Sequence, residues 1–139
     1  MRTRQYPSVL ISFVAGFLAL GPAFVIEKMF QHALPFWVEI GAVGVVEELL
    51  KGGISLLIMR ANRPRILPVA TALGFAASET ALYVFSLGVV WHMRIGVFLF
   101  HILTGVILAR SVRNKRAGAG LTLNIALHWL WNLIAAGFI

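Results

Sequence analysis

The 139-residue sequence contains no cysteine, and its five acidic residues are all glutamate. The absence of cysteine excludes a disulfide scaffold, a thiolate zinc finger, a cysteine nucleophile and an iron–sulfur centre. Charge is scarce as well, because only 12% of the residues are charged, about half the share of a soluble domain. A mean hydropathy of +0.89 argues against a soluble domain and against disorder. We therefore expect residues 1–139 to form one integral membrane domain in the lipid bilayer.

Long apolar runs account for most of the remaining composition. A transmembrane helix needs about 20 apolar residues, and five such segments are expected: 9–26, 34–59, 66–91, 95–109 and 121–139. The predicted fold class is all-α, a polytopic bundle of about five transmembrane helices. The formal net charge of +7 does not indicate nucleic-acid binding, because the basic residues fill the gaps between apolar runs rather than an aromatic-interleaved face.

The basic residues predict the orientation of this bundle. With five spans, nine of them fall on the N-terminal side and only Lys28 and Arg94 fall on the other, while Lys51 lies inside a span. Because cytoplasmic loops are enriched in lysine and arginine, the N-terminus is predicted to be cytoplasmic. The nine are Arg2, Arg4, Arg60, Arg63, Arg65, Arg110, Arg113, Lys115 and Arg116.

Ionisable residues also lie deep within the predicted helices, where they are costly unless paired or hydrated. At a rise of about 1.5 Å per residue, Glu47 and Glu79 lie about 18 and 20 Å from the cytoplasmic helix ends. His101 and His128 lie about 12 and 11 Å from the same side. Four helices thus place polar groups near one level, which predicts a single polar site inside the bundle.

Spacing within the helices supports a shared site. Lys51 follows Glu47 by four residues and Glu48 by three, so it can neutralise either carboxylate on the same helix face. His128 and Asn132 are also four residues apart and point to one spot. Small residues that let helices pack closely surround these positions; they are Gly41, Gly44, Gly52, Gly53, Ala70, Gly74 and Ser78.

Several chemistries fit this set of residues. Carboxylates and imidazoles in a water-limited site suit the activation of a water molecule, with glutamate accepting its proton. The same groups suit Zn²⁺, for which Glu47, Glu79, His101 and His128 are the candidate ligands. Buried glutamate and histidine also form proton relays, so a proton-coupled carrier is an alternative. Five spans without inverted repeats are few for a transporter, although a homo-oligomer could supply a path.

Four motifs, one per helix, resemble the PrsW family of intramembrane proteases. They are Glu-Glu-x-x-Lys at 47–51, aromatic-x-x-x-Glu at 75–79, His101, and His-x-x-x-Asn at 128–132. The wider superfamily includes the CAAX prenyl endopeptidases, the bacterial Abi proteins and the scaffold subunit of γ-secretase. The positions of Lys51 and Glu79 are similar to those of the PrsW branch rather than the CAAX and Abi branches.

The resemblance implies proteolysis of a membrane-protein substrate in the cytoplasmic membrane of a prokaryote, with glutamate-dependent or metal-dependent chemistry. It implies that Glu47 activates water, that Lys51 holds Glu48, and that Glu79 and His101 are partners of the water or of a metal. His128 and Asn132 would stabilise the oxyanion or complete the metal shell. A non-catalytic scaffold of the same superfamily is the alternative. The candidate catalytic set is therefore Glu47, Glu48, Lys51, Glu79, His101, His128 and Asn132.

Overall fold

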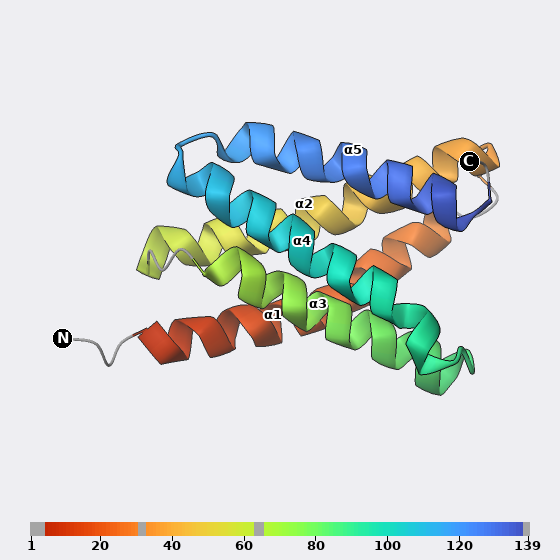
Figure 1. Ribbon diagram of the computed structural model, residues 1–139, viewed down its shortest axis with the longest axis horizontal. Helices are drawn as coiled ribbons and strands as arrows, with labels where there is room; N and C mark the ends of the chain where they lie inside the picture. The colour runs from red at the N-terminus through yellow and green to blue at the C-terminus, as the bar shows by residue number, and fades with distance from the viewer. Residues whose placement is uncertain (1–4, 31–32, 63–65, 138–139) are drawn as a thin grey trace.

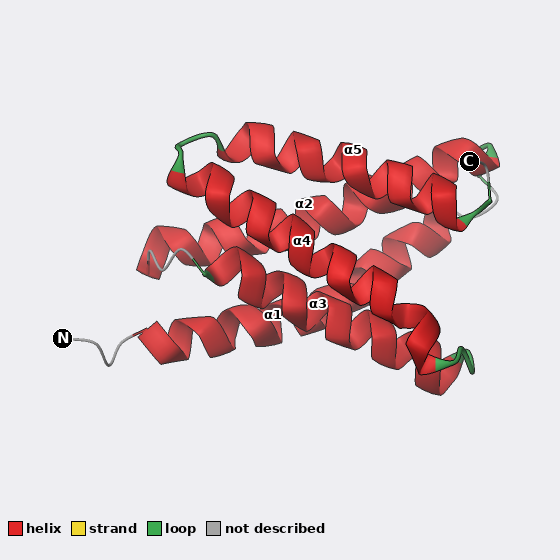
Figure 2. Cartoon of the chain, in the orientation of Figure 1, coloured by secondary structure: helices red, strands yellow, loops and turns green. Residues whose placement is uncertain are grey.

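The computed structural model describes residues 5–30, 33–62 and 66–137, which are helical apart from short connections and contain no strand. The helices are antiparallel to their neighbours along the chain (Figures 1 and 2). This confirms the predicted all-α fold with five long helices. They are α1 (Gln5–Phe30), α2 (Phe36–Asn62), α3 (Leu67–Ala81), α4 (Ile95–Arg113) and α5 (Ala117–Ala135).

The helices pack in a closed ring in which α1 contacts α3, α3 contacts α4, α4 contacts α5, α5 contacts α2, and α2 contacts α1. Helices α2 and α3 also touch across the ring. The contact between α1 and α3 is a backbone contact, because a Cβ on Gly16 would overlap the carbonyl of Thr71 and one on Gly74 would overlap that of Phe13. Gly74 was among the predicted packing glycines, whereas Gly53, predicted with it, faces open space.

The third predicted span, 66–91, is wrong at its C-terminal end. Helix α3 ends at Ala81 and continues as one wider π-helical turn, η1 (Leu82–Ser86). Gly88 then adopts a φ of +67°, a left-handed conformation that ends the helix and reverses the chain. Trp91 belongs to a 3₁₀ turn, η2 (Trp91–Arg94), that leads into α4. The apolar run continued through this reversal, so hydropathy alone did not reveal it.

Helices α4 and α5 both extend beyond the predicted spans at the end where they are joined. Helix α4 runs to Arg113 instead of residue 109, and α5 begins at Ala117 instead of residue 121. A helix ends where its backbone hydrogen bonds end, and charged side chains can continue it beyond the apolar stretch into the aqueous boundary.

Among the described residues, three helical segments are long and apolar enough to cross a membrane: Pro7–Phe30, Leu67–Ser86 and Trp91–Arg113. Helix α2 carries Glu47, Glu48 and Lys51, and α5 carries His128, and all four side chains are buried inside the bundle. Their polar residues lower the hydropathy of the two helices while facing protein rather than lipid. That α2 and α5 also cross the bilayer stays a prediction.

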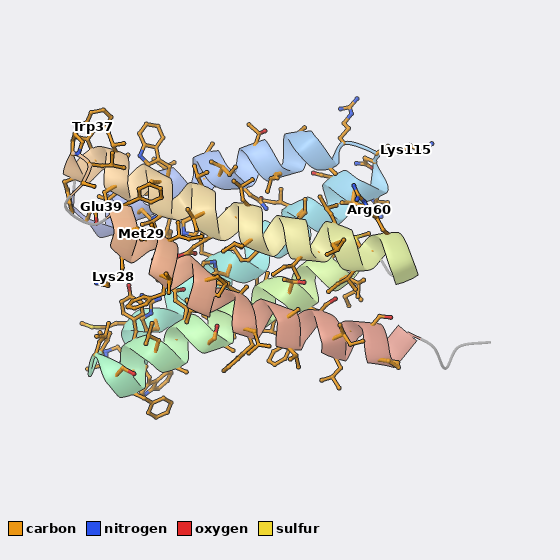
Figure 3. All side chains as sticks on the ribbon, turned by 180° about the vertical axis from the view of Figure 1, so that it is seen from behind. Lys28, Met29, Trp37, Glu39, Arg60 and Lys115 are labelled. Atoms are coloured by element: carbon orange, nitrogen blue, oxygen red, sulfur yellow. The ribbon has the colours of Figure 1, made fainter. Side chains whose placement is uncertain are left out.

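Outside the buried interior, the charged residues labelled in Figure 3 lie at the two ends of the bundle. Arg60 and Lys115 lie at the end where the chain begins, and Lys28, Trp37 and Glu39 lie at the opposite end (Figure 3). This arrangement agrees with the predicted sorting. Its cytoplasmic assignment remains a prediction, and Arg2, Arg4, Arg63 and Arg65 lie outside the described residues.

Candidate active site

Six ionisable side chains from α2, α3, α4 and α5 meet inside the ring, and none is more than 8% exposed. The structure therefore brings together the residues that the sequence placed at one level of the bundle. They are Glu47, Glu48, Lys51, Glu79, His101 and His128.

Lys51 is the centre of this cluster. Its Nζ donates to Oε1 of Glu48 at 2.6 Å and to Nδ1 of His101 at 2.7 Å, whereas Oε2 of Glu47 is 3.9 Å away. The lysine thus holds Glu48 rather than Glu47. Because a charged lysine can only donate, Nδ1 of His101 accepts, and Nε2 carries the ring proton. That proton is donated to Oε2 of Glu79 at 2.7 Å.

Glu79 has both oxygens occupied. Oε2 accepts from His101, and Oε1 accepts from Nη2 of Arg94 at 2.5 Å. The Arg94 side chain is only 11% exposed and its guanidinium lies over the Tyr83 ring at 4.0 Å. The sequence had placed Arg94 on the side of the membrane opposite the N-terminus and had not predicted its pairing with Glu79. Glu79 lies close to the end of α3, so a short reversal brings the start of α4 back beside it.

His128 is held by the second carboxylate of α2. Its Nδ1 lies 2.9 Å from Oε1 of Glu48, which is also bound by Lys51. An ionised carboxylate only accepts, so Nδ1 donates and the lone pair is on Nε2. That nitrogen lies 3.5 Å from Oε2 of Glu47. A histidine oriented by a carboxylate in this way is the usual arrangement around a protein-bound metal.

Glu47 differs from the other two glutamates. Its side chain is buried, yet Oε2 has no hydrogen-bond partner among the described residues. His128 and His101 place their Nε2 atoms 3.5 and 3.9 Å from this oxygen. The cluster therefore leaves one carboxylate oxygen available between two imidazoles, while Glu48 and Glu79 serve to orient those imidazoles.

These three residues fit a metal ion. Glu47, His101 and His128 each offer one ligand atom, and the atoms lie within 4.8 Å of one another. Two histidines and a glutamate are a common ligand set of catalytic zinc. The unpartnered oxygen of Glu47 is suited to be the carboxylate ligand of that set. Neutral histidine binds a metal through the ring nitrogen that carries no proton, so the proton of His101 would have to leave Nε2 before that nitrogen could bind the ion. Glu79 was predicted as a fourth ligand. Among the described residues, it does not belong to this group of three.

A cavity of about 350 Å³ leads to the free carboxylate. Glu47, Glu79, Arg94 and Asn132 are among its lining residues, and so are Lys28 and Glu39. Figure 3 places those last two at the end of the bundle opposite Arg60 and Lys115. The cavity thus extends from the cluster toward that end, and its volume and polar walls suit several water molecules.

Glu27 is a further carboxylate of this cavity. It lines the cavity with Glu47, and among the described residues its buried Oε1 has no hydrogen-bond partner. Sequence reasoning missed this role because Glu27 sits near the end of α1. Only the crossing of α1 over α2 and α3 turns it inward.

The asparagines of α5 have structural partners. Nδ2 of Asn132 donates to the backbone oxygen of Ile40 at 3.3 Å, and its side chain also lines the cavity. Asn124, one turn before His128, is 1% exposed and donates to the backbone oxygen of Thr104 at 2.8 Å. Residues 124, 128 and 132 form one stripe at a spacing of four. That spacing could have identified Asn124, which links α5 to α4.

Aromatic side chains enclose the two histidines. Phe75 is fully buried and packs edge-on against His101, with ring centroids 5.4 Å apart. Phe100 contacts both imidazoles and stacks on Trp131 at 5.1 Å. These rings limit the rotation of the imidazoles and keep lipid and bulk water away from the cluster.

Comparison with known proteins agrees with this geometry. The family described as PrsW family intramembrane metalloprotease matches residues 5–138, nearly the whole chain. Searches of curated proteins and of solved structures find no match. The matched region contains all four motifs and the buried cluster that they form. The chain therefore belongs to the PrsW family of intramembrane metalloproteases, and it is an integral membrane protein.

Proposed function

We propose that this protein hydrolyses a peptide bond of a membrane-protein substrate, with the Glu47 carboxylate as general base toward a water molecule in the cavity. The observation that carries the proposal is the environment of Glu47. It is a buried carboxylate with an unpartnered oxygen, set beside two oriented imidazoles on a polar cavity. A protease whose nucleophile is water needs a positioned base of this kind, because water must lose a proton as it attacks an amide carbonyl.

In the proposed reaction the Glu47 carboxylate takes one proton from water as the water oxygen attacks the carbonyl carbon. The same carboxyl group then returns the proton to the amide nitrogen, and the carbon–nitrogen bond breaks. A substrate helix has to unwind locally, since helical carbonyl groups are already hydrogen-bonded. Asn132 lines the cavity and supplies an amide N–H for the developing oxyanion.

Glu48, Lys51 and Glu79 are positioning residues in this proposal. Glu48 and Glu79 fix the tautomers of His128 and His101, and Lys51 holds both Glu48 and His101. His128 presents a lone pair rather than a proton toward Glu47, so oxyanion stabilisation falls to Asn132. This division of roles revises the expectation that His128 and Asn132 act as one pair.

Zn²⁺ is the proposed cofactor, held by Glu47, His101 and His128. When bound, the ion would polarise the scissile carbonyl and favour ionisation of water. Glu47 has two oxygens, so one can bind the ion while the other accepts the proton. His128 would stay oriented by Glu48, whereas Nε2 of His101 would give up its bond to Glu79 in order to bind the ion.

Glu47→Gln tests the proposal, because glutamine keeps the shape of the side chain and cannot accept the proton. We expect cleavage of a tagged single-span membrane protein in proteoliposomes to fall by about 10²-fold or more. Glu39→Gln is the matched control, since Glu39 lines the outer part of the same cavity away from the cluster. Unchanged cleavage by a folded Glu47→Gln protein would overturn the assignment of the base, whereas absence of cleavage by the unsubstituted protein would favour a scaffold role.

A further inference from the structure

A second groove lies between α4 and α5 on the outside of the bundle, at the end marked by Lys115 in Figure 3. Its volume is about 360 Å³. Arg110, Ser111, Asn114 and Arg116 line it at the turn between the two helices. The groove does not share a lining residue with the cavity that contains Glu47. The two are therefore separate candidate sites.

The groove changes from polar to apolar along the helices. Beyond the two arginines, its walls are formed by Ile107 on α4 and Leu123 on α5. Leu123 is seven residues from Arg116, which at the helical rise is about 10 Å deeper along the bundle. A groove with cationic donors at its end and an apolar wall below matches an amphiphile with an anionic head and a hydrocarbon tail.

No carboxylate competes for the arginines of this groove. The five glutamates of the chain are at positions 27, 39, 47, 48 and 79. In the described part of the chain, neither Arg110 nor Arg116 forms an ion pair, whereas Lys51 and Arg94 both do. Basic pockets between helices at a membrane surface are suited to lipid phosphate groups. A guanidinium is also well matched to two phosphate oxygens at once.

We propose that this groove binds one anionic phospholipid, with its phosphate between Arg110 and Arg116 and an acyl chain along Ile107 and Leu123. The bound lipid joins α4 to α5 near a tight contact, where Gly120 leaves no room for a Cβ beside Ser111. His101 is on α4 and His128 is on α5, so the lipid would hold together the two helices that supply the imidazoles. The lipid site does not depend on the proposed proteolysis.

The test measures lipid binding by the purified full chain in detergent micelles, using native mass spectrometry and thermal unfolding. Phosphatidylglycerol is the probe, phosphatidylcholine is the uncharged comparison, and inorganic phosphate tests a free anion. We expect phosphatidylglycerol to bind and to raise the unfolding temperature more than the other two. An equal effect of inorganic phosphate would overturn the assignment of a lipid as the ligand. An equal effect of phosphatidylcholine would contradict the proposed recognition of an anionic headgroup by the arginines.

Paired variants test the location. Arg110→Gln with Arg116→Gln should weaken phosphatidylglycerol binding about thirtyfold, from the attraction of two cations near an anionic headgroup. Arg60→Gln with Arg113→Gln removes the same charge from residues that do not line the groove, and should leave binding unchanged. An equal loss of binding in both double variants would mean that the net charge of the protein attracts the lipid. That result would overturn the assignment of the lipid site to this groove.

A second substitution keeps the test independent of the arginines. Leu123→Trp should fill the apolar wall and weaken binding while both guanidinium groups remain, which a free phosphate site would not show. Far-UV circular dichroism establishes that each variant is helical before binding is measured. Undiminished binding to a folded Leu123→Trp protein would contradict the proposed position of the acyl chain.

Discussion

Replacing Lys51 by methionine tests whether one ammonium group holds the buried cluster together. Methionine has a similar length and no charge, so the change removes the two short hydrogen bonds to Glu48 and His101 with little change in volume. Glu48 is then left 2% exposed, with only the Nδ1 proton of His128 as a donor. Its negative charge has lost its nearest positive partner.

The expected cost follows from this environment. Breaking a buried ion pair by removing one partner destabilises a protein by about 3–5 kcal/mol, because the remaining charge is buried without compensation. Total stabilities are about 5–15 kcal/mol, so Lys51→Met should remove a large part of the folding free energy. Lys115→Met should have no measurable effect, because Lys115 is exposed at the end of the bundle.

The assay is equilibrium unfolding by sodium dodecyl sulfate in mixed micelles, followed by circular dichroism and by fluorescence of the four tryptophans. A double variant, Glu48→Gln with Lys51→Met, removes both charges and keeps an acceptor for His128. It should be more stable than the sum of the single effects predicts, with a coupling of about 1–3 kcal/mol. Strictly additive single effects would refute the reasoning that Glu48 and Lys51 compensate each other.

Three further predictions concern packing, the second ion pair and the metal. Gly74→Ala should lower the unfolding midpoint, because the added Cβ meets the backbone of α1. Gly53→Ala should be neutral or stabilising, because Gly53 faces open space. Equal effects of the two substitutions would contradict the α1–α3 contact. Arg94→Met should destabilise the protein by about 3 kcal/mol, and Glu79→Gln in the same chain should restore part of that loss; no rescue would argue against the ion pair. The purified protein should contain close to one zinc ion per chain by elemental analysis, and His128→Ala should reduce that content. A zinc content unaffected by His128→Ala would exclude the proposed ligand set.

The positions of the buried charges were largely predictable, whereas their partners were not. Long apolar segments indicated the helices, and the constant helical rise put Glu47, Glu79, His101 and His128 at comparable depths. The spacing of Lys51 allowed pairing with either Glu47 or Glu48, since both lie within one turn. Packing of α4 against α3 and α5 placed His101 Nδ1 beside the lysine, and Lys51 pairs with Glu48 in that geometry.

The positions of the Arg94 and Glu27 side chains could not be predicted from the sequence alone. Both lie near helix ends, where residues are ordinarily solvated, and both are turned toward the central cavity. The inward direction of Arg94 depends on the π-helical turn and on the reversal at Gly88, which bring the start of α4 back to Glu79. Neither feature alters hydropathy, so the apolar pattern did not indicate them.

Composition and local spacing thus determined the membrane setting, the all-α class and the residue types available for chemistry. These properties follow from helical periodicity and from the cost of burying charge, which act within each segment. The rotation of each helix about its axis, and therefore the choice of facing atoms, depended on contacts between helices. Only the tertiary structure could decide that Glu48 and Glu79 are occupied while Glu47 keeps an unpartnered oxygen, because those bonds join residues from four helices.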